Sequence, residues 1–177
     1  MSMEFIDSIK ARIPDYAKDI RLNLDGTISR SSLEGTDAVG VALAAAIAAK
    51  STVLIKTIRE AGVLSPEETN AVLTAAALMG MNNTWYPYVE MADDADLKTQ
   101  RAELRMGAYA THGGVDKRKF EMYALAASIV GKCHFCVKSH YALLKNEQGM
   151  TVTQLRDVGR IASVINAAAQ VIAAEGE

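Results

Sequence analysis

The sequence predicts an all-α fold. Alanine-rich segments with an apolar period of about 3.6 residues recur along the whole chain, as expected for helices. Alternating runs of β-branched and aromatic residues, which are typical of strands, are almost absent. The chain has only three prolines. Half of its 177 residues are hydrophobic, so it can bury a sizeable core. We therefore expect one helical domain that spans residues 1–177.

Local start and stop signals define the helices of the first half. Pro14 suits the first turn of a helix and Asp25-Gly26 marks its exit, while residues 27–36 look like a loop with Thr36 as the next N-cap. Ser65-Pro66-Glu67-Glu68 combines an N-cap, a first-turn proline and a capping-box glutamate. The expected helices are Met3–Arg12, Pro14–Asn23, Ala38–Ala49, Ser51–Ala61, Pro66 to about Gly80, and Met81 to about Met91.

The second half begins with an acidic turn around Asp93 to Asp96, which is expected to precede a helix that ends near Ala108. His112-Gly113-Gly114 reads as a loop, and Asp116 as the N-cap of a helix. The expected helices that follow are Lys117 to Val130, a cysteine-containing helix from about Gly131 to Asn146, and a last amphipathic helix that starts at Thr151 or Thr153 and reaches Ala174.

An internal repeat is visible when the chain is compared with itself. Leu64–Trp85 resembles Val115–Cys136 at an offset of 51 residues, the separation of Gly80 and Gly131. Each copy consists of a capped helix, an Ala-Ala pair, a glycine and a new helix. The first copy has Asn82 and Trp85 where the second has its cysteines. We therefore expect two helical units, at about residues 37–92 and 98–174, packed face to face.

Composition excludes some classes of protein. The chain has 19 Lys and Arg against 21 Asp and Glu, a net charge of −2, which argues against an obligate nucleic-acid partner. No apolar run approaches the roughly 18 residues of a membrane span, and Met1–Lys10 is too acidic for a signal peptide. We expect a cytoplasmic protein without a membrane partner, whose two cysteines serve catalysis or metal binding.

The reactive side chains concentrate in Gly131–His140, which holds both cysteines and two of the three histidines. On a helix, Cys133, Cys136 and His140 share one face. Near a helix start, unpaired N–H groups and the helix dipole stabilise a thiolate, and His140 is one turn from Cys136, where it can take the thiol proton. This arrangement predicts that Cys136 attacks a substrate and Cys133 resolves the product as a disulfide.

Glu121 is a candidate partner for the imidazole. It stands twelve residues before Cys133 on the preceding helix, and a hairpin at Gly131 would fold it back toward His140. A carboxylate there would orient the imidazole and complete a Cys-His-Glu relay. Spacing alone leaves other positions for Glu121 open.

The pattern Glu121-x11-Cys133-x2-Cys136-x3-His140 resembles the active-site motif of the AhpD alkylhydroperoxidases, within the carboxymuconolactone decarboxylase-like superfamily. The segments IPDYAKDIRLNL, AALMGMNN and RAELRM resemble other parts of the same family, so the resemblance covers most of the chain. It implies an AhpD-like helical fold of two repeated units, a homotrimer, and a thiol-dependent peroxidase.

The resemblance also implies roles for individual residues. Cys136 would reduce a hydroperoxide and become a sulfenic acid, and Cys133 would condense with it to a disulfide. His140 and Glu121 would form the proton relay. Dihydrolipoyl groups of 2-oxoacid dehydrogenase complexes would regenerate the dithiol as a co-substrate, with a peroxiredoxin as a downstream partner and no bound cofactor or metal.

One position departs from the family pattern. The family often has a histidine immediately before the second cysteine, where this chain has Phe135, and His134 lies one place earlier. One residue turns a side chain by about 100° on a helix, so His134 does not simply replace the missing group. His134 stays open between a solvent-exposed side chain and a group of the proton relay or substrate side.

Other interpretations of the motif remain. The cysteines could be two small buried hydrophobic residues, or Cys133, Cys136 and His140 could bind a metal with Glu121 as a fourth ligand. The alternative functions are a redox-sensing or metal-binding interaction module, and a carboxymuconolactone decarboxylase-like enzyme. The dithiol argues against the last, because proton-transfer chemistry on a lactone does not need one.

Overall fold

The computed structural model describes residues 4–176, and this range contains helices and no strand, so the all-α prediction is confirmed. The expected start of the first helix at Met3 lies outside the described residues. The α-helices are α1 (Glu4–Lys10), α2 (Lys18–Leu24), α3 (Gly35–Ala48), α4 (Thr52–Glu60), α5 (Pro66–Ala92), α6 (Lys117–Val130), α7 (His134–Asn146) and α8 (Val152–Ala174). Shorter helical turns are η1 (Asp15–Ala17), η2 (Asp25–Ser29), η3 (Leu97–Thr99) and η4 (Gly107–Gly114).

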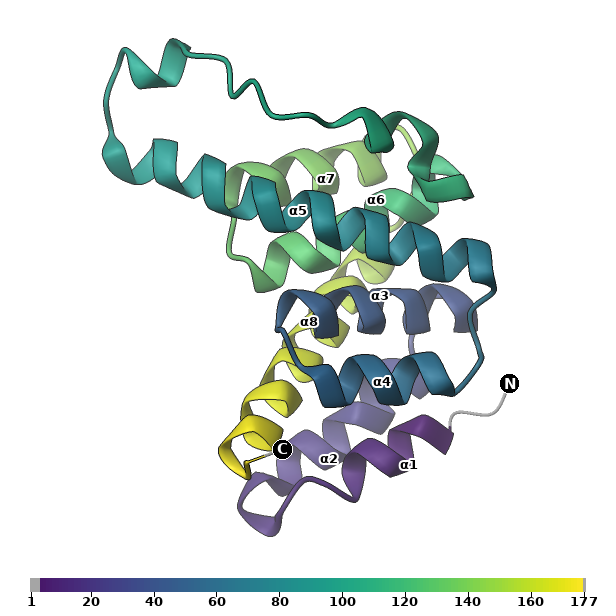
Figure 1. Cartoon of the computed structure of the whole chain (residues 1–177). Coiled ribbons are helices and arrows are strands. Elements are labelled where there is room, and N and C mark those ends of the chain that lie inside the picture. Colours follow the sequence, from purple (N-terminus) through teal and green to yellow (C-terminus); the bar gives the residue numbers. More distant parts are fainter. Residues whose placement is uncertain (1–3, 177) are drawn as a thin grey trace.

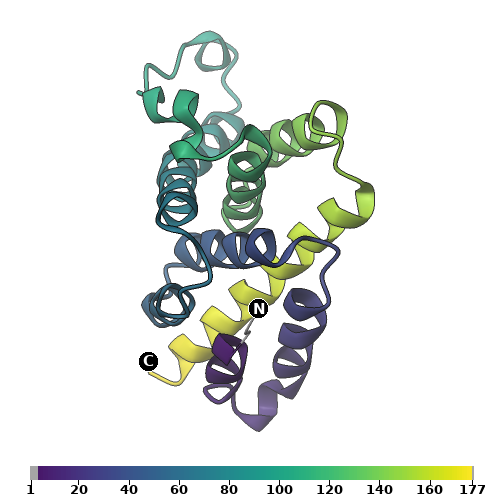
Figure 2. The ribbon, with the colours of Figure 1, turned by 90° about the vertical axis from the view of Figure 1, so that its right-hand side faces the viewer.

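Helix α3 lies at the centre of the molecule (Figure 1). It packs on α4, α5, α6 and α8, and it is buried nearly all round, as its alanine-rich sequence predicts. A view turned by 90° shows α8 passing obliquely between the α5–α6–α7 group and the α1–α2 pair (Figure 2). Within residues 4–176, no helix combines the length and apolar character that a bilayer span requires.

Close approach of α3 and α6 depends on Gly40. A Cβ at this position would lie 2.3 Å from Cε1 of Tyr123, whose ring is completely buried on α6. Burial, together with nearby carboxylates such as Asp37, raises the pKa of the Tyr123 phenol above its usual value, so the hydroxyl stays protonated. Small residues on α3 therefore allow the large side chains of α6 into the core.

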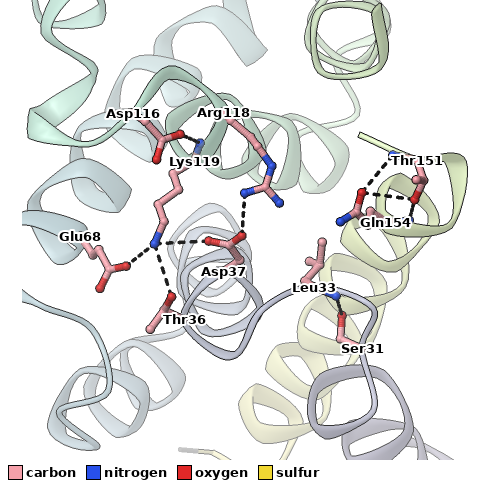
Figure 3. A network of polar contacts seen from close by, with 10 residues as sticks. All are labelled: Ser31, Leu33, Thr36, Asp37, Glu68, Asp116, Arg118, Lys119, Thr151 and Gln154. Atoms are coloured by element: carbon pink, nitrogen blue, oxygen red, sulfur yellow. Dashed lines mark hydrogen bonds and ion pairs between the residues drawn. The ribbon is translucent and has the colours of Figure 1, made fainter. Parts of the chain in front are cut away.

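A buried ionic network joins the N-termini of α3, α5 and α6 (Figure 3). Asp37 is completely buried, and Arg118 Nη1 and Lys119 Nζ lie 3.0 and 3.4 Å from its two oxygens. Lys119 also donates to Glu68 Oε1 at 2.5 Å and to Thr36 at 3.3 Å. Burial alone would lower the pKa of Lys119, but the hydrogen bond to Glu68 and the two carboxylate charges raise it, so the ammonium stays charged.

A second buried carboxylate ties α8 to the segment before α3. Asp157 is 1% exposed and accepts hydrogen bonds from the backbone N–H and hydroxyl of Ser32, at 2.8 and 2.7 Å. Arg156 and Arg160 also donate to it. Burial opposes ionisation, but these hydrogen bonds hold the pKa of Asp157 well below its usual range.

Several predicted helix ends are confirmed. Ser65 and Thr151 each form a capping box with the residue three places on, and Asp116 accepts from the backbone N–H of Lys119 at 2.9 Å. Gly131 is the C-cap of α6. These signals are local, because each depends on side chains within one turn of the helix end.

The break expected at Gly80 is wrong, because α5 is continuous from Pro66 to Ala92 and even contains Pro87. Contacts beyond Gly80 keep the helix in place: Asn83 Nδ2 donates to Ala127 O of α6 at 3.0 Å. The first unit therefore lacks the turn of the second. The two-unit organisation stays a prediction, although Glu68–Lys119, a pair at the same 51-residue offset, are in contact.

Three other boundaries also differ from expectation. Thr36 is inside α3, whose N-cap is Glu34, because the Thr36 hydroxyl accepts from Lys119 instead of capping the backbone. Residues 25–29, expected to hold the helix exit and the start of a loop, form a π-helical turn. The helix expected to end near Ala108 is absent, because residues 100–106 have no regular structure. The loop expected at His112 is present as a kink inside η4, where His112 and Gly113 leave the helical conformation with φ 50° and 61°.

Candidate active site

The two cysteines form a disulfide at the N-terminus of α7. Cys133 is the N-cap and Cys136 lies in the first turn, with their Cα atoms 5.3 Å apart. The backbone N–H of Cys136 donates to Cys133 Sγ at 3.2 Å, so a sulfur fills the role that a serine or aspartate oxygen usually has. Cys133 is completely buried and Cys136 is 3% exposed. The pair thus combines an N-terminal helix position with almost complete burial.

The turn between α6 and α7 is fixed by contacts with α5. Asn83 Nδ2 and the backbone N–H of Gly131 both donate to Ala127 O, at 3.0 and 2.9 Å. The Asn83 side chain lies directly on Gly131, where a Cβ would come within 2.2 Å of Nδ2. Lys132 adopts a left-handed conformation with φ 55°, and the N–H of Cys133 then bonds back to Ser128 O. This turn sets the position of both sulfurs.

The same hairpin brings Glu121 of α6 against His140 of α7. Glu121 Oε2 lies 2.6 Å from His140 Nδ1, and the two residues are 0% and 7% exposed. A buried carboxylate at this distance fixes the orientation of the imidazole and favours the proton on Nδ1, which leaves Nε2 free to accept a proton. The hairpin at Gly131 therefore brings Glu121 to His140, as the spacing of the motif predicts, and the role of the pair as a proton relay stays a prediction.

Two further side chains complete this cluster, and sequence reasoning did not find them. The Tyr109 hydroxyl, from η4, donates to Glu121 Oε1. His140 Nε2 lies 3.2 Å from Met79 Sδ of α5. Neither residue is related to the cysteines by helical spacing, because each belongs to another element of the chain. The only sequence signal for Tyr109 is its place just before the His112-Gly113-Gly114 turn.

His134 and Phe135 lie on the surface, apart from the buried pair. The His134 side chain is 80% exposed, and its Nδ1 is 3.0 Å from Glu90 Oε1 at the C-terminal part of α5. Phe135 is 56% exposed and stacks on Tyr86, with ring centroids 4.2 Å apart. The structure therefore brings Glu121 and His140 together, with His140 one turn of α7 after Cys136, and leaves His134 outside this cluster.

A surface groove lies away from the cysteines. It has a volume of about 830 Å³ and lies between α4 and α5, where Ile55, Leu64 and Leu73 contribute to its lining. None of its lining residues belongs to α6 or α7. Among residues 4–176, His, Cys, Asp and Glu side chains form no group of three or more that could hold a metal ion. The chemistry available at the cysteines is thiol–disulfide exchange beside a carboxylate–imidazole pair.

Comparison of the sequence with known proteins places this chain in a family. Residues 95–176 match the model of the carboxymuconolactone decarboxylase family. The chain is 41% identical over 172 residues to "Alkyl hydroperoxide reductase AhpD" of Rhodospirillum centenum, an alignment that covers 96% of this chain and 91% of that protein. The proteins of the same name from Maricaulis maris and Streptomyces coelicolor are 40% and 37% identical over 173 and 172 residues, which is 96% of this chain and 98% and 96% of theirs. The chain belongs to the AhpD group of the carboxymuconolactone decarboxylase family.

Proposed function

We propose that this protein is a thiol-dependent alkyl hydroperoxide reductase, an enzyme of the peroxidase class. The observation that carries the proposal is the Cys133–Cys136 pair at the start of α7, backed by the buried Glu121–His140 pair. Relatives that align over almost the whole chain bear the name alkyl hydroperoxide reductase. Geometry and relatives thus support the same reaction type.

In the first step, His140 accepts the proton of the Cys136 thiol through Nε2, and the thiolate attacks the distal oxygen of the hydroperoxide. The O–O bond breaks, an S–O bond forms, and the leaving alkoxide takes a proton to become the alcohol. Cys136 is then a sulfenic acid. Glu121 stabilises the imidazolium that exists during the step, as the carboxylate does in related triads.

In the second step, the Cys133 thiol attacks the sulfenic sulfur of Cys136. An S–S bond forms and the hydroxyl leaves as water with the thiol proton, so the peroxide has been reduced to alcohol and water at the expense of two thiols. The 5.3 Å separation of the two Cα atoms suits this closure. The disulfide in the structure is the product expected from this step.

A dithiol donor closes the cycle by thiol–disulfide exchange, leaving as its own disulfide. We propose a dihydrolipoyl group of a 2-oxoacid dehydrogenase complex, because both sulfurs of Cys133 and Cys136 are almost fully buried and a donor needs a slender arm to reach them. The proposal includes a peroxiredoxin as a partner, a homotrimeric assembly and a cytoplasmic location.

The position of His134 limits the relay in this proposal. Its pairing with Glu90 on the surface leaves His140 and Glu121 as the groups that exchange protons with Cys136. Phe135 provides an exposed aromatic ring stacked on Tyr86 beside the cysteines, which offers apolar contact to the carbon part of a hydroperoxide.

A thiol count tests the reaction directly, because the chain has only two cysteines. The reduced protein, under anaerobic conditions, receives one equivalent of cumene hydroperoxide. We expect two free thiols before the addition and none after it, and turnover when dihydrolipoamide is supplied. Retention of both thiols would refute the proposal. A stoichiometric reaction without turnover by dihydrolipoamide would favour a redox-sensing module.

Serine variants assign the two sulfurs. Cys133→Ser keeps an N-cap oxygen for α7 and should accumulate a sulfenic acid on Cys136, which a dimedone adduct reveals by mass spectrometry. Cys136→Ser should leave Cys133 as an unreacted thiol. The opposite pattern would exchange the two roles, and unchanged turnover in Cys136→Ser would favour decarboxylase-like chemistry instead.

A further inference from the structure

We propose that Tyr109 is a positioning residue of this site, which holds the Glu121 carboxylate so that it orients His140. The proposal rests on the proposed function only where it concerns turnover. Tyr109 comes from η4, outside the α6–α7 hairpin that carries the cysteine motif. A third element of the fold thereby acts on the proton relay.

The two oxygens of the Glu121 carboxylate have different partners. Oε2 lies against His140 Nδ1 at 2.6 Å, and Oε1 accepts the Tyr109 hydroxyl hydrogen bond. Glu121 is completely buried, and within residues 4–176 no lysine or arginine forms an ion pair with it. Without Tyr109, Oε1 of the buried carboxyl group would lose the hydrogen-bond donor that the structure gives it, and proteins rarely leave a buried acceptor without a donor.

Aromatic contacts hold the Tyr109 ring in place. It meets the buried ring of Phe120 edge to face, with centroids 5.4 Å apart and planes at 90°, and it also contacts His112 at 6.0 Å. Phe120 immediately precedes Glu121 on α6. The ring therefore lies beside the backbone that carries the carboxylate, and the hydroxyl is directed to Oε1.

The turn after Tyr109 fastens η4 to α5. Gly113 has φ 61°, its carbonyl oxygen accepts from Asn70 Nδ2 at 3.0 Å, and a Cβ there would lie 2.5 Å from Ala71 Cα. His112 also adopts a left-handed conformation, with φ 50°, which is unfavourable for a residue with a side chain. Backbone strain of this kind persists where surrounding contacts require it and is often found at functional sites.

The function of the hydrogen bond follows from the charge it contacts. A donor on the ionised form of a carboxylate favours that form, so we expect removal of the Tyr109 hydroxyl to move proton uptake by the Glu121–His140 pair to higher pH. Among residues 4–176, the side chains from outside α6 and α7 that form hydrogen bonds or polar contacts with Glu121 and His140 are Tyr109 from η4 and Met79 from α5. Tyr109 is the one of these that donates to the carboxylate.

Tyr109→Phe removes this donor while keeping the ring. We expect kcat with cumene hydroperoxide and dihydrolipoamide to fall about ten-fold, and KM for the hydroperoxide to stay within about two-fold. The acidic limb of the pH profile of kcat/KM should move to higher pH by about one unit, because the pair gains its proton more easily.

The matched control is Tyr16→Phe. Tyr16 also donates to a glutamate, Glu175 Oε1 at 2.8 Å, but it is 69% exposed and belongs to η1. Both variants lose one Tyr–Glu hydrogen bond and one hydroxyl. We expect the pH profile of Tyr16→Phe to coincide with that of the wild type. A Tyr109→Phe profile equal to the control would overturn the proposal.

A measurement without turnover separates this proposal from the proposed function. The imidazole of His140, one of three histidines, is titrated by NMR in the reduced protein. In Tyr109→Phe the midpoint should rise by about one pH unit, even if the wild type reduces no hydroperoxide. An unchanged midpoint would overturn the proposal whatever the activity.

Should Tyr109→Phe fail to fold, 3-fluorotyrosine at position 109 provides the second test. The fluorinated phenol is a stronger hydrogen-bond donor, so the His140 midpoint should move to lower pH, opposite to the phenylalanine variant. A midpoint that does not move would contradict the role of the hydroxyl.

Discussion

Gly131→Ala is a sharp test of the turn that positions the cysteines. Gly131 has φ −72°, a conformation that alanine adopts easily, so the substitution causes no strain in the backbone itself. The obstacle is Asn83, because the new Cβ would lie 2.2 Å from Nδ2, 2.5 Å from Cγ and 2.8 Å from Cβ of that side chain. The alanine can be accommodated only if Asn83 moves.

The cost can be worked out from this contact. If Asn83 rotates away, its hydrogen bond to Ala127 O is lost, which costs about 1 kcal/mol, and the crowded contact adds about 1–3 kcal/mol. Alanine at the helix end recovers less than about 1 kcal/mol relative to glycine. We therefore expect Gly131→Ala to lower the free energy of unfolding by about 1–4 kcal/mol.

Gly80→Ala provides the matched control, since Gly80 is the counterpart of Gly131 in the repeat. A Cβ at Gly80 meets nothing within 4 Å, and the residue lies inside the continuous helix α5. This variant should be more stable than the wild type by up to about 1 kcal/mol, because alanine loses less conformational entropy in a helix.

Urea denaturation of the oxidised proteins measures both free energies of unfolding. The Asn83→Ala background then isolates the contact: there, Gly131→Ala should cost at least about 1 kcal/mol less than in the wild type. Equal effects in the two backgrounds, or a Gly131→Ala protein as stable as the wild type, would refute the reasoning.

Two further predictions concern the buried carboxylates. Asp157→Asn should have a free energy of unfolding about 1.5–3 kcal/mol below that of the wild type at neutral pH. Because folding lowers the pKa of Asp157, this difference should shrink as the pH falls below about 4. Urea denaturation from pH 7 to 3 measures it. A difference independent of pH would contradict the role of its charge. Lys119→Met leaves the buried Asp37 with fewer partners and should lower the free energy of unfolding by about 3 kcal/mol or more. Lys56→Met, the control, breaks an exposed ion pair and should lower it by less than about 1 kcal/mol. Thermal or urea denaturation measures both.

Helix ends were predictable from the sequence where one turn of chain contains all the necessary groups. Ser65, Asp116 and Thr151 each accept from a backbone N–H three residues away, so their effect depends little on the rest of the fold. The same holds for the start of the cysteine helix after Gly131, where the turn and the N-cap lie within a few residues.

Boundaries that depend on distant residues were not predictable. Gly80 has the sequence context of a helix break, but Asn83 binds α6 and the helix continues. Thr36 has the features of an N-cap, but Lys119, remote in sequence, occupies its hydroxyl. In both cases a tertiary contact outweighs a local preference of about 1 kcal/mol.

The candidate site likewise contains residues that local spacing predicts and one residue that only tertiary packing reveals. Cys133, Cys136 and His140 follow from helical spacing, and Glu121 from one hairpin. Tyr109 follows an irregular segment of the chain, so helical spacing does not predict its contact with Glu121. Only the packing of η4 on α5 and α6 reveals it.

The sulfur cap at the start of α7 has an evolutionary consequence. Cys133 fills a position at which serine is among the preferred residues, and one nucleotide change converts a cysteine codon into a serine codon. A descendant with serine at 133 would keep its helix start and its fold while losing the disulfide. Paralogues that cannot close the disulfide are therefore one mutation away, and the N-cap role alone does not explain why this position is a cysteine.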